Sequence, residues 1–182
     1  MLKDDVAKVL ISEEEIIQRC KELGKIITAD YEGKKPIMVA LLKGSIPFLT
    51  ELVKYIDLPL EIDYLDVSSY EGTESSGEIN IRKDLDRPVR DKDILIVEDI
   101  VDTGRTLTTV KQYLYNKGVK DVKVVALLDK KCRRVVEMEA EYIGFDIPDY
   151  FVVGFGLDYN QKYRNLPFVG VLKEEIYCKE VE

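Results

Sequence analysis

The sequence of 182 residues contains no histidine, and this absence excludes several kinds of site at once. Serine–histidine and cysteine–histidine nucleophile pairs are ruled out, and so are metal sites with histidine ligands. Any general base must be a carboxylate, a lysine, a tyrosine or a cysteine. A metal ion would have to be a hard cation on oxygen ligands, and magnesium bound together with phosphates fits that requirement.

Cysteine is scarce, and long apolar runs are absent. The three cysteines, Cys20, Cys132 and Cys178, are odd in number and widely spaced. This predicts reduced thiols in a cytoplasmic protein, with no zinc-binding spacing. No run approaches the length needed to span a membrane, and residues 1–10 do not resemble a signal peptide, so no membrane association is expected.

Positive charge is also in short supply. The 27 basic residues are outnumbered by 35 acidic ones, which gives a net charge of −8 and an isoelectric point near 4.8. A nucleic-acid-binding surface is therefore not expected as the main function. Hydrophobic residues make up 46% and charged residues 34%, a profile typical of globular proteins. The length and the lack of repeats or linkers predict a single domain over 1–182.

The stretch DILIVEDIVDTGRTLTTV, residues 93–110, is the part of the sequence richest in functional signals. Its first apolar run predicts a buried parallel strand that stops at Glu98 and Asp99. A loop over 100–105 follows. Apolar residues then recur at helical spacing, and Gly118 is well placed to end that helix.

This order of elements suits a sugar phosphate. The free N–H groups and the dipole of a helix start favour a phosphate, and Thr103 and Thr106 add hydroxyl donors. Gly104 allows the backbone to approach an anion closely. The carboxylates of Glu98 and Asp99 can accept hydrogen bonds from ribose hydroxyls or lie near a metal. Donors and an acceptor pair side by side are what a ribose 5-phosphate requires.

A plainer alternative is that the two carboxylates are solvated and that Asp102 or Thr103 caps the helix. The acidic pair directly after a buried strand favours the phosphate site. The string VEDIVDTGRTL resembles the phosphoribosyl pyrophosphate (PRPP) loop of the type I phosphoribosyltransferases, in particular their hypoxanthine-guanine branch. The resemblance implies that the phosphoribosyl group is bound by Glu98, Asp99, Asp102, Thr103, Gly104, Arg105 and Thr106. Some relatives have lysine in place of Arg105, and both residues are cationic.

A second strand–loop–helix unit occurs earlier in the chain. IMVALLKGS predicts a buried strand over 37–42 that runs into a small turn, and Pro47 suits the first turn of a helix. Taken alone, this is most simply a structural connection. The resemblance implies that the turn binds pyrophosphate through Lys43 and Gly44, and that the peptide bond before Lys43 is cis.

The segment 61–67 alternates as a strand does, and SSYEGTESSGEINI follows it. Its composition fits either an exposed hairpin or a mobile lid. Ser69 and Tyr70 look like the Ser-Tyr pair of the family's flexible loop. Such a loop would keep water away from the activated sugar.

Lys130 follows another buried strand, predicted over 122–128. A lysine at a strand end is most often simply solvated. By position, Lys130 is similar to the family lysine that donates to the exocyclic oxygen of a 6-oxopurine. An ammonium group has only donors, so it accepts a 6-oxo group and penalises the 6-amino group of adenine.

The string PDYFVVGFGLDYNQKYRNLP resembles the family's purine- and pyrophosphate-binding segment. The resemblance implies that Phe151 stacks on the base and that the backbone of Val152 reads its ring edge. Asp158 would lie at the purine site and bind magnesium together with Glu98 and Asp99. Arg164 would hold pyrophosphate, which suits a planar guanidinium.

The sequence is thus expected to form an α/β fold with a parallel twisted sheet, helices on both faces and, by resemblance, a small hood made by the terminal segments. The implied reaction joins PRPP to hypoxanthine or guanine, gives IMP or GMP plus pyrophosphate, and requires Mg²⁺. Asp102 is the expected general base and acid at purine N7. A homodimer or homotetramer is expected by resemblance.

Three alternatives stay open. A related transferase could act on xanthine or another base. A non-catalytic nucleotide sensor that binds RNA or DNA would need a basic face, which this composition does not favour. A PRPP-synthesising kinase shares the acidic pair, but the chain looks short for one and has no histidine to assist ATP. The set Asp102, Lys130, Asp158 and Arg164 favours a transferase.

Overall fold

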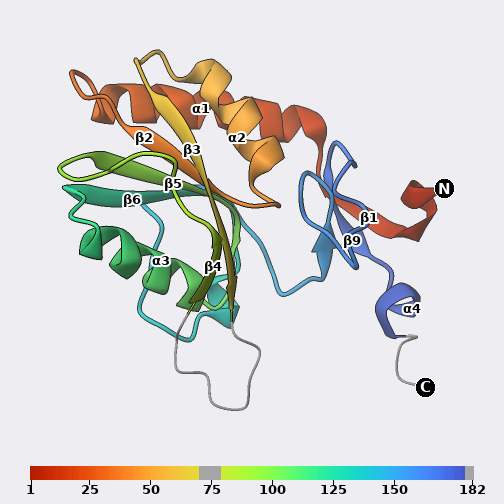
Figure 1. Cartoon of the computed structure of the whole chain (residues 1–182). Helices are drawn as coiled ribbons and strands as arrows, with labels where there is room; N and C mark the ends of the chain where they lie inside the picture. The colour runs from red at the N-terminus through yellow and green to blue at the C-terminus, as the bar shows by residue number, and fades with distance from the viewer. Residues whose placement is uncertain (70–78, 179–182) are drawn as a thin grey trace.

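The computed structural model describes residues 1–69 and 79–178, which form a six-stranded central sheet and a smaller three-stranded sheet (Figure 1). The strand order of the central sheet is β4-β3-β2-β5-β6-β7. Its strands are β2 (Ile37–Leu41), β3 (Glu61–Ser69), β4 (Ile79–Lys83), β5 (Asp93–Val101), β6 (Asp121–Asp129) and β7 (Tyr142–Asp146). Five of them are parallel, as the sequence predicts. The sixth strand, β4, is antiparallel to β3, which agrees with the hairpin that the sequence leaves open for this part of the chain.

Helices cover both faces of the central sheet. They are α1 (Glu13–Asp30) and α2 (Ile46–Leu52) on one face and α3 (Arg105–Asn116) on the other, with short 3₁₀ turns η1 (Leu2–Asp5), η2 (Val53–Tyr55) and η3 (Lys131–Arg133). A reciprocal pair of hydrogen bonds between Ser12 and Glu15 starts α1, at 2.7 and 3.2 Å. Gly118 follows the end of α3 with φ of 81°, the left-handed conformation that glycine adopts readily.

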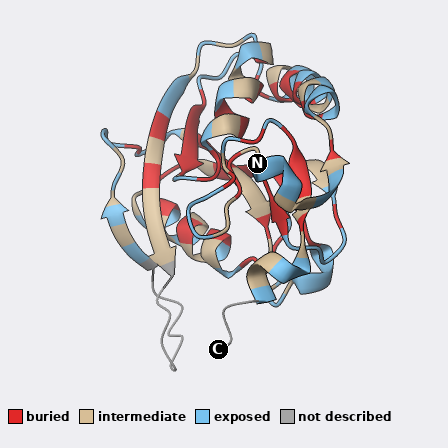
Figure 2. Ribbon diagram, turned by 90° about the vertical axis from the view of Figure 1, so that its right-hand side faces the viewer, coloured by how far each residue is buried: buried red, intermediate tan, exposed pale blue. Residues whose placement is uncertain are grey.

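Alternate residues of β5 face the two core layers. Ile94 and Ile96 contact the layer under α3, whereas Leu95 and Val97 contact the layer under α1 and α2. All four are fully buried, and Figure 2 shows buried residues along the strands and the inner faces of the helices. A strand buried on both faces needs such a continuous apolar run, because successive side chains point to opposite sides.

The terminal segments build the second sheet, the small hood that the resemblance implies. Its antiparallel order is β1-β9-β8, and its strands are β1 (Val6–Ile11), β8 (Val152–Val153) and β9 (Val169–Leu172), followed by α4 (Glu174–Tyr177). Val153, Phe168 and Leu172 belong to a hydrophobic core of this second sheet, separate from the two core layers of the central sheet. The hood lies beside the end of the central sheet at which β2 stops (Figure 1).

Over residues 1–69 and 79–178, no helix is long and apolar enough to span a membrane. The three cysteines form no disulfide bond. Cys20 lies within the core, where burial raises the pKa of its thiol to about 12. Cys132 and Cys178 are exposed.

Candidate active site

A hollow of about 80 Å³ lies between the carboxyl end of β5 and the start of α3. It is lined by the predicted residues Glu98, Asp102, Thr103, Gly104 and Thr106, together with Ile100, Val101 and Leu107. Gly104 occupies the N-cap position of α3 with φ of 83° and has no side chain that could cap the helix. The Arg105 amide has only a long contact, 3.4 Å, to the Thr103 hydroxyl. The positive end of α3 therefore borders a hollow into which an anion can enter.

The predicted end of β5 was wrong. The strand does not stop at the acidic pair but continues to Val101, and its last two residues pair with Leu128 and Asp129 of β6. Backbone pairing with β6 does not depend on the polarity of the side chains, so the two strands stay paired past Glu98 and Asp99. The predicted loop over 100–105 is shortened accordingly.

This extension separates the two carboxylates that the sequence places side by side. Neighbouring residues in a strand point to opposite faces. Glu98 lines the hollow at α3. Asp99 faces the turn after β2, because a Cβ atom on Gly44 would lie 1.6 Å from Asp99 Oδ2. The two carboxylates therefore lie beside different loops: Glu98 beside the loop before α3, and Asp99 beside the turn after β2.

Both acids are poorly solvated. Burial raises the pKa of Glu98 well above its ordinary value, and the negative charge of Asp99 raises it further. Burial also raises the pKa of Asp99 to about 6, although the Ile100 amide at 2.7 Å and the charge of Arg164 act in the opposite direction. Carboxyl groups with strongly raised pKa values cluster at functional sites.

Replacing Asp99 should stabilise the ligand-free protein at pH 7. The folded-state pKa of about 6 exceeds the ordinary value of 3.8, so this group favours folding only when protonated, and its contribution is lost as the pH rises from 3.8 through 6. The full shift corresponds to about 3 kcal/mol, and partial exposure of the residue lowers our expectation for Asp99→Asn to about 1–2 kcal/mol. Urea unfolding measures this gain, which must shrink between pH 7 and pH 5. A gain that grows toward low pH would contradict the assignment.

The turn predicted to bind pyrophosphate follows β2. The peptide bond between Leu42 and Lys43 is cis, as the resemblance implies. Ser45 is fully buried and its hydroxyl donates to the Leu41 carbonyl oxygen at 2.5 Å. The backbone of Gly44 lies against Gly156, where an added Cβ would be 1.9 Å from the Gly44 carbonyl oxygen. This turn and the loop after β8 are thus in direct contact.

The loop after β8 brings two further predicted residues to this place. Arg164 donates to the Gly156 carbonyl oxygen at 2.6 Å, and its guanidinium lies 2.7 Å from the Asp158 carboxylate. The Gln161 amide donates to the other oxygen of Asp158 at 2.9 Å. The structure therefore gathers Gly44, Asp99, Asp158 and Arg164 around one junction between the central sheet and the hood.

The residues predicted to bind the purine come from two elements. Lys130 is 9% exposed at the end of β6, and its amide donates to the Val101 carbonyl oxygen at 2.9 Å. Val152 is buried and begins β8. Phe151, 39% exposed, stacks on Tyr177 with ring centroids 4.8 Å apart. Sequence reasoning missed Tyr177, because nothing in the spacing of the terminal segment relates it to Phe151.

Sequence reasoning also missed two arginines that reach the Asp102 loop. Arg134 donates to the Asp102 carbonyl oxygen and pairs with the buried Asp129 carboxylate at 2.5 Å. Arg133 Nε lies 3.1 Å from Asp102 Oδ1. The sequence feature that could have pointed to these arginines is the charged string DKKCRR, which directly follows the buried strand predicted over 122–128.

The predicted lid is described only at its edge. Ser69 is the last residue of β3 and pairs with Ile79 of β4. Tyr70 lies outside the described residues. The lid stays a prediction.

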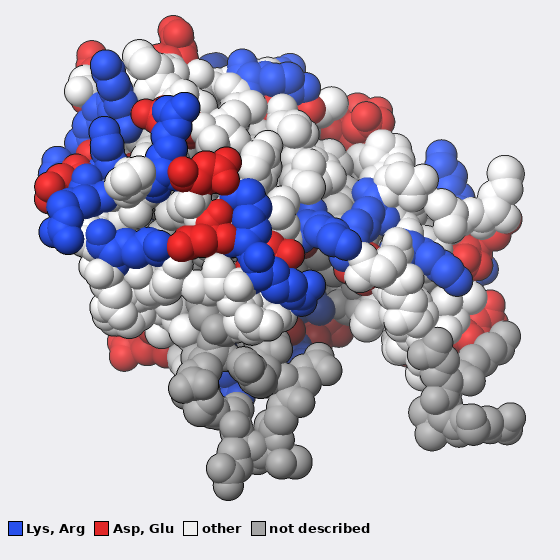
Figure 3. Space-filling model, in the orientation of Figure 1, with Lys and Arg blue, Asp and Glu red and all other residues white. Residues whose placement is uncertain are grey.

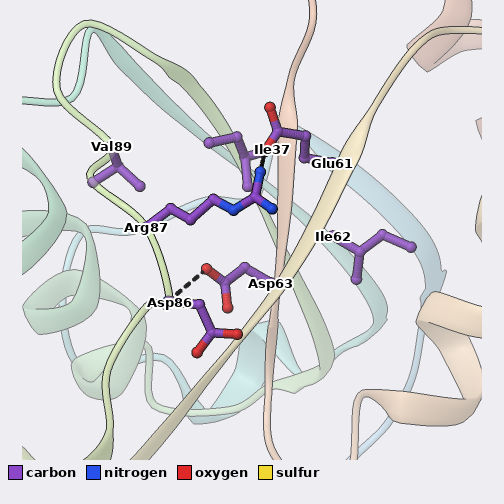
Figure 4. A pocket seen from close by; sticks show the side chains of 7 residues that line it. All are labelled: Ile37, Glu61, Ile62, Asp63, Asp86, Arg87 and Val89. Atoms are coloured by element: carbon purple, nitrogen blue, oxygen red, sulfur yellow. Dashed lines mark hydrogen bonds and ion pairs between the residues drawn. The ribbon is translucent and has the colours of Figure 1, made fainter.

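Figure 4 shows a different cavity, of about 300 Å³, at the amino ends of β2 and β3. Glu61, Asp63 and Asp86 line it, and Arg87 lies 3.5 Å from Glu61. Asp63 accepts a hydrogen bond from the Asp86 amide at 2.9 Å. In open α/β sheets ligands bind at the carboxyl ends of the strands, so we place the candidate site at the opposite end.

The family model of the phosphoribosyl transferase domain matches residues 9–160. A hypoxanthine-guanine phosphoribosyltransferase of Lactococcus lactis is 58% identical over 175 residues, which cover 96% of this chain and 95% of that protein. The crystal structure of a hypoxanthine phosphoribosyltransferase from Staphylococcus aureus superposes with a TM-score of 0.94 at 50% identity, covering 97% of this chain and 96% of the other. A hypoxanthine-guanine phosphoribosyltransferase from Bacillus anthracis, 41% identical, gives a TM-score of 0.89 over 92% of this chain and 99% of that chain. The chain therefore belongs to the type I phosphoribosyltransferases, a family of pentosyl-transferring enzymes, in the branch that contains these relatives.

Proposed function

We propose that this enzyme acts in purine salvage by transferring the 5-phosphoribosyl group from PRPP to hypoxanthine or guanine, with IMP or GMP and pyrophosphate as products. The observation that carries the proposal is the hollow at the start of α3. Acceptors for ribose hydroxyls on Glu98 and donors for a phosphate at Thr103 and Thr106 surround one small space. The names of the relatives supply the acceptor base.

Asp102 is our candidate for the general base and acid at purine N7. It lines the hollow, and its Oδ1 atom is buried without a hydrogen-bond partner, although Arg133 lies 3.1 Å away as an ion-pair partner. A buried carboxylate oxygen with spare acceptor capacity is suited to take a proton from a bound base. In a chain without histidine, a carboxylate is the natural group for this step.

Lys130, Phe151 and Val152 are our candidates for reading the base. The Lys130 amide is hydrogen-bonded to the end of β5, which keeps this residue next to the Asp102 loop. Its ammonium group would donate to the 6-oxo group, Phe151 would stack on the ring, and the Val152 backbone would meet the ring edge. Preference at the 2-position of the purine, which separates guanine, hypoxanthine and xanthine, is decided by the assay below.

Magnesium fits the acids of this site when phosphates supply the remaining ligands. Within the described part of the chain, no group of three or more acidic or cysteine side chains could hold a metal ion by itself. Mg²⁺ commonly binds one or two carboxylates plus substrate phosphates. Asp158 would hold it at the pyrophosphate, with Glu98 and Asp99 near the ribose. When bound, the ion would neutralise the charge of the departing pyrophosphate.

A nucleotide sensor that binds RNA or DNA is less well supported. Figure 3 shows basic and acidic side chains interspersed on the face that it draws, without a continuous basic surface. The net charge is −8, and phosphate backbones require clustered positive charge.

The direct test is a magnesium-dependent assay with PRPP against hypoxanthine, guanine, xanthine and adenine. We expect pyrophosphate release with hypoxanthine and guanine and little with adenine. Transfer to adenine alone, or to none of the four bases, would refute the proposal. Strong transfer to xanthine would change the assigned substrate while leaving the reaction class intact.

Lys130→Met should weaken discrimination between 6-oxo and 6-amino purines. Loss of the ammonium donor removes a hydrogen bond to O6 and also removes the penalty against an amino group. The ratio of kcat/KM for hypoxanthine over adenine should fall by about tenfold or more. The matched control is Lys131→Met, which removes the neighbouring exposed charge that pairs with Asp146 at 3.0 Å. An unchanged ratio in Lys130→Met would remove Lys130 from the base pocket.

A further inference from the structure

Arg133 bridges two carboxylates beside the candidate site. Its Nε lies 3.1 Å from Asp102 Oδ1, and its Nη1 lies 3.7 Å from Asp149 Oδ2. The other oxygen of Asp149 is 3.7 Å from Lys130 Nζ. The four side chains therefore form a row of alternating charges that runs from Asp102 through Arg133 and Asp149 to Lys130.

The two neighbouring arginines hold different parts of Asp102. Arg134 is largely buried and donates to the Asp102 carbonyl oxygen, so it fixes the backbone of the loop. Arg133 has a side chain that is 48% exposed, and it forms an ion pair with the carboxylate of Asp102. The direction of the Asp102 side chain thus depends on Arg133, because its Oδ1 has no hydrogen bond of its own.

The two ends of the row, Asp102 and Lys130, carry the two kinds of group that one edge of a 6-oxopurine requires. N7 and O6 of a 6-oxopurine are neighbouring acceptors on the same edge. A group that exchanges a proton at N7 and a donor to O6 must be held at a fixed separation, because small errors in position reduce rates strongly. Arg133 and Asp149 are the groups that join the two ends of this row.

We propose that Arg133 is a positioning residue for phosphoribosyl transfer: it holds the Asp102 carboxylate in the direction of the incoming base and, through Asp149, ties that direction to the position of Lys130. The inference rests on the proposed role of Asp102. Among the described residues, the ion pairs of Arg133 go to Asp102 and Asp149 and not to the junction around Gly44, Asp99, Asp158 and Arg164. Its loss should therefore affect the position of the base and the turnover rate.

The test begins with Arg133→Met, which keeps the stem of the side chain and removes the guanidinium. We expect kcat to fall by about tenfold, with the KM for PRPP and the midpoint of thermal unfolding unchanged. Arg133→Lys should recover part of the loss, since an ammonium can still pair with a carboxylate. Lys131→Met, a neutralised neighbour that pairs with Asp146 instead, should turn over like wild type. A general loss of stability or an equal effect of Lys131→Met would overturn the proposal.

A double-mutant cycle with Asp102→Asn completes the test. If Arg133 acts through Asp102, adding Arg133→Met to Asp102→Asn should cause no further loss of kcat. A further tenfold loss in that background would show that Arg133 acts by another route and would refute the inference. If Arg133→Met turned over like wild type while Asp102→Asn was inactive, the inference about Arg133 would be refuted and the proposed role of Asp102 would stand. Wild-type turnover in Asp102→Asn would instead refute the proposed role of Asp102.

Discussion

Asp102→Asn should lower kcat by about a hundredfold or more while the protein folds normally. Loss of a general base commonly costs 10²–10⁴ in rate, roughly 3–5 kcal/mol of transition-state stabilisation. An asparagine has nearly the same shape as aspartate, and the backbone of residue 102 stays fixed because Arg134 donates to its carbonyl oxygen. The loss should therefore appear in catalysis and not in stability.

The measurement is initial rate with hypoxanthine at saturating PRPP, together with thermal unfolding of both proteins. Asp146→Asn serves as the control, because Asp146 is an exposed carboxylate at the end of β7 that pairs with Lys131. It should retain wild-type turnover. Turnover of Asp102→Asn within a few-fold of wild type would show that another group exchanges the proton.

The strand–loop–helix unit around Asp102 could be predicted from local sequence because its signals are local. The buried run before Glu98 has the apolar character that a strand covered on both faces requires, and Leu107, Val110 and Leu114 are buried at helical spacing. The position of the hollow follows from these two elements alone. The resemblance added roles for its residues, and those roles stay predictions.

Features that depend on distant partners could not be predicted from the residues themselves. The division of Glu98 and Asp99 between two loops requires β5 to stay paired with β6 beyond the apolar run. The contact of Arg133 with Asp102 joins positions 31 residues apart, and no local pattern relates the two.

The contact between the turn after β2 and the loop after β8 leads to the second large prediction. Gly156 has φ of 100°, and a Cβ atom there would lie 1.9 Å from the Gly44 carbonyl oxygen and 3.0 Å from Pro47 Cδ. The obstacle is backbone, so it cannot rotate away as a side chain would. In Gly156→Ala, the loop after β8 and the turn after β2 must therefore move apart.

Gly156→Ala should destabilise the protein by about 3 kcal/mol or more, because strain from the left-handed conformation, roughly 1 kcal/mol, adds to the steric cost of moving a packed backbone. Activity should fall by about a hundredfold even where the protein remains folded, since a displacement of about 1 Å in a positioning loop has effects of that size.

Gly33→Ala separates these two contributions. Gly33 has φ of 75° and no atom within 4 Å of the added Cβ, so the substitution introduces left-handed strain without a clash. It should cost about 1 kcal/mol and leave turnover unchanged. If the two variants proved equally stable and equally active, the close approach of Gly156 to Gly44 would have no part in holding the turn after β2. A loss of activity in Gly156→Ala alone would mean that the hood, through a single backbone contact, sets the position of a loop on the central sheet.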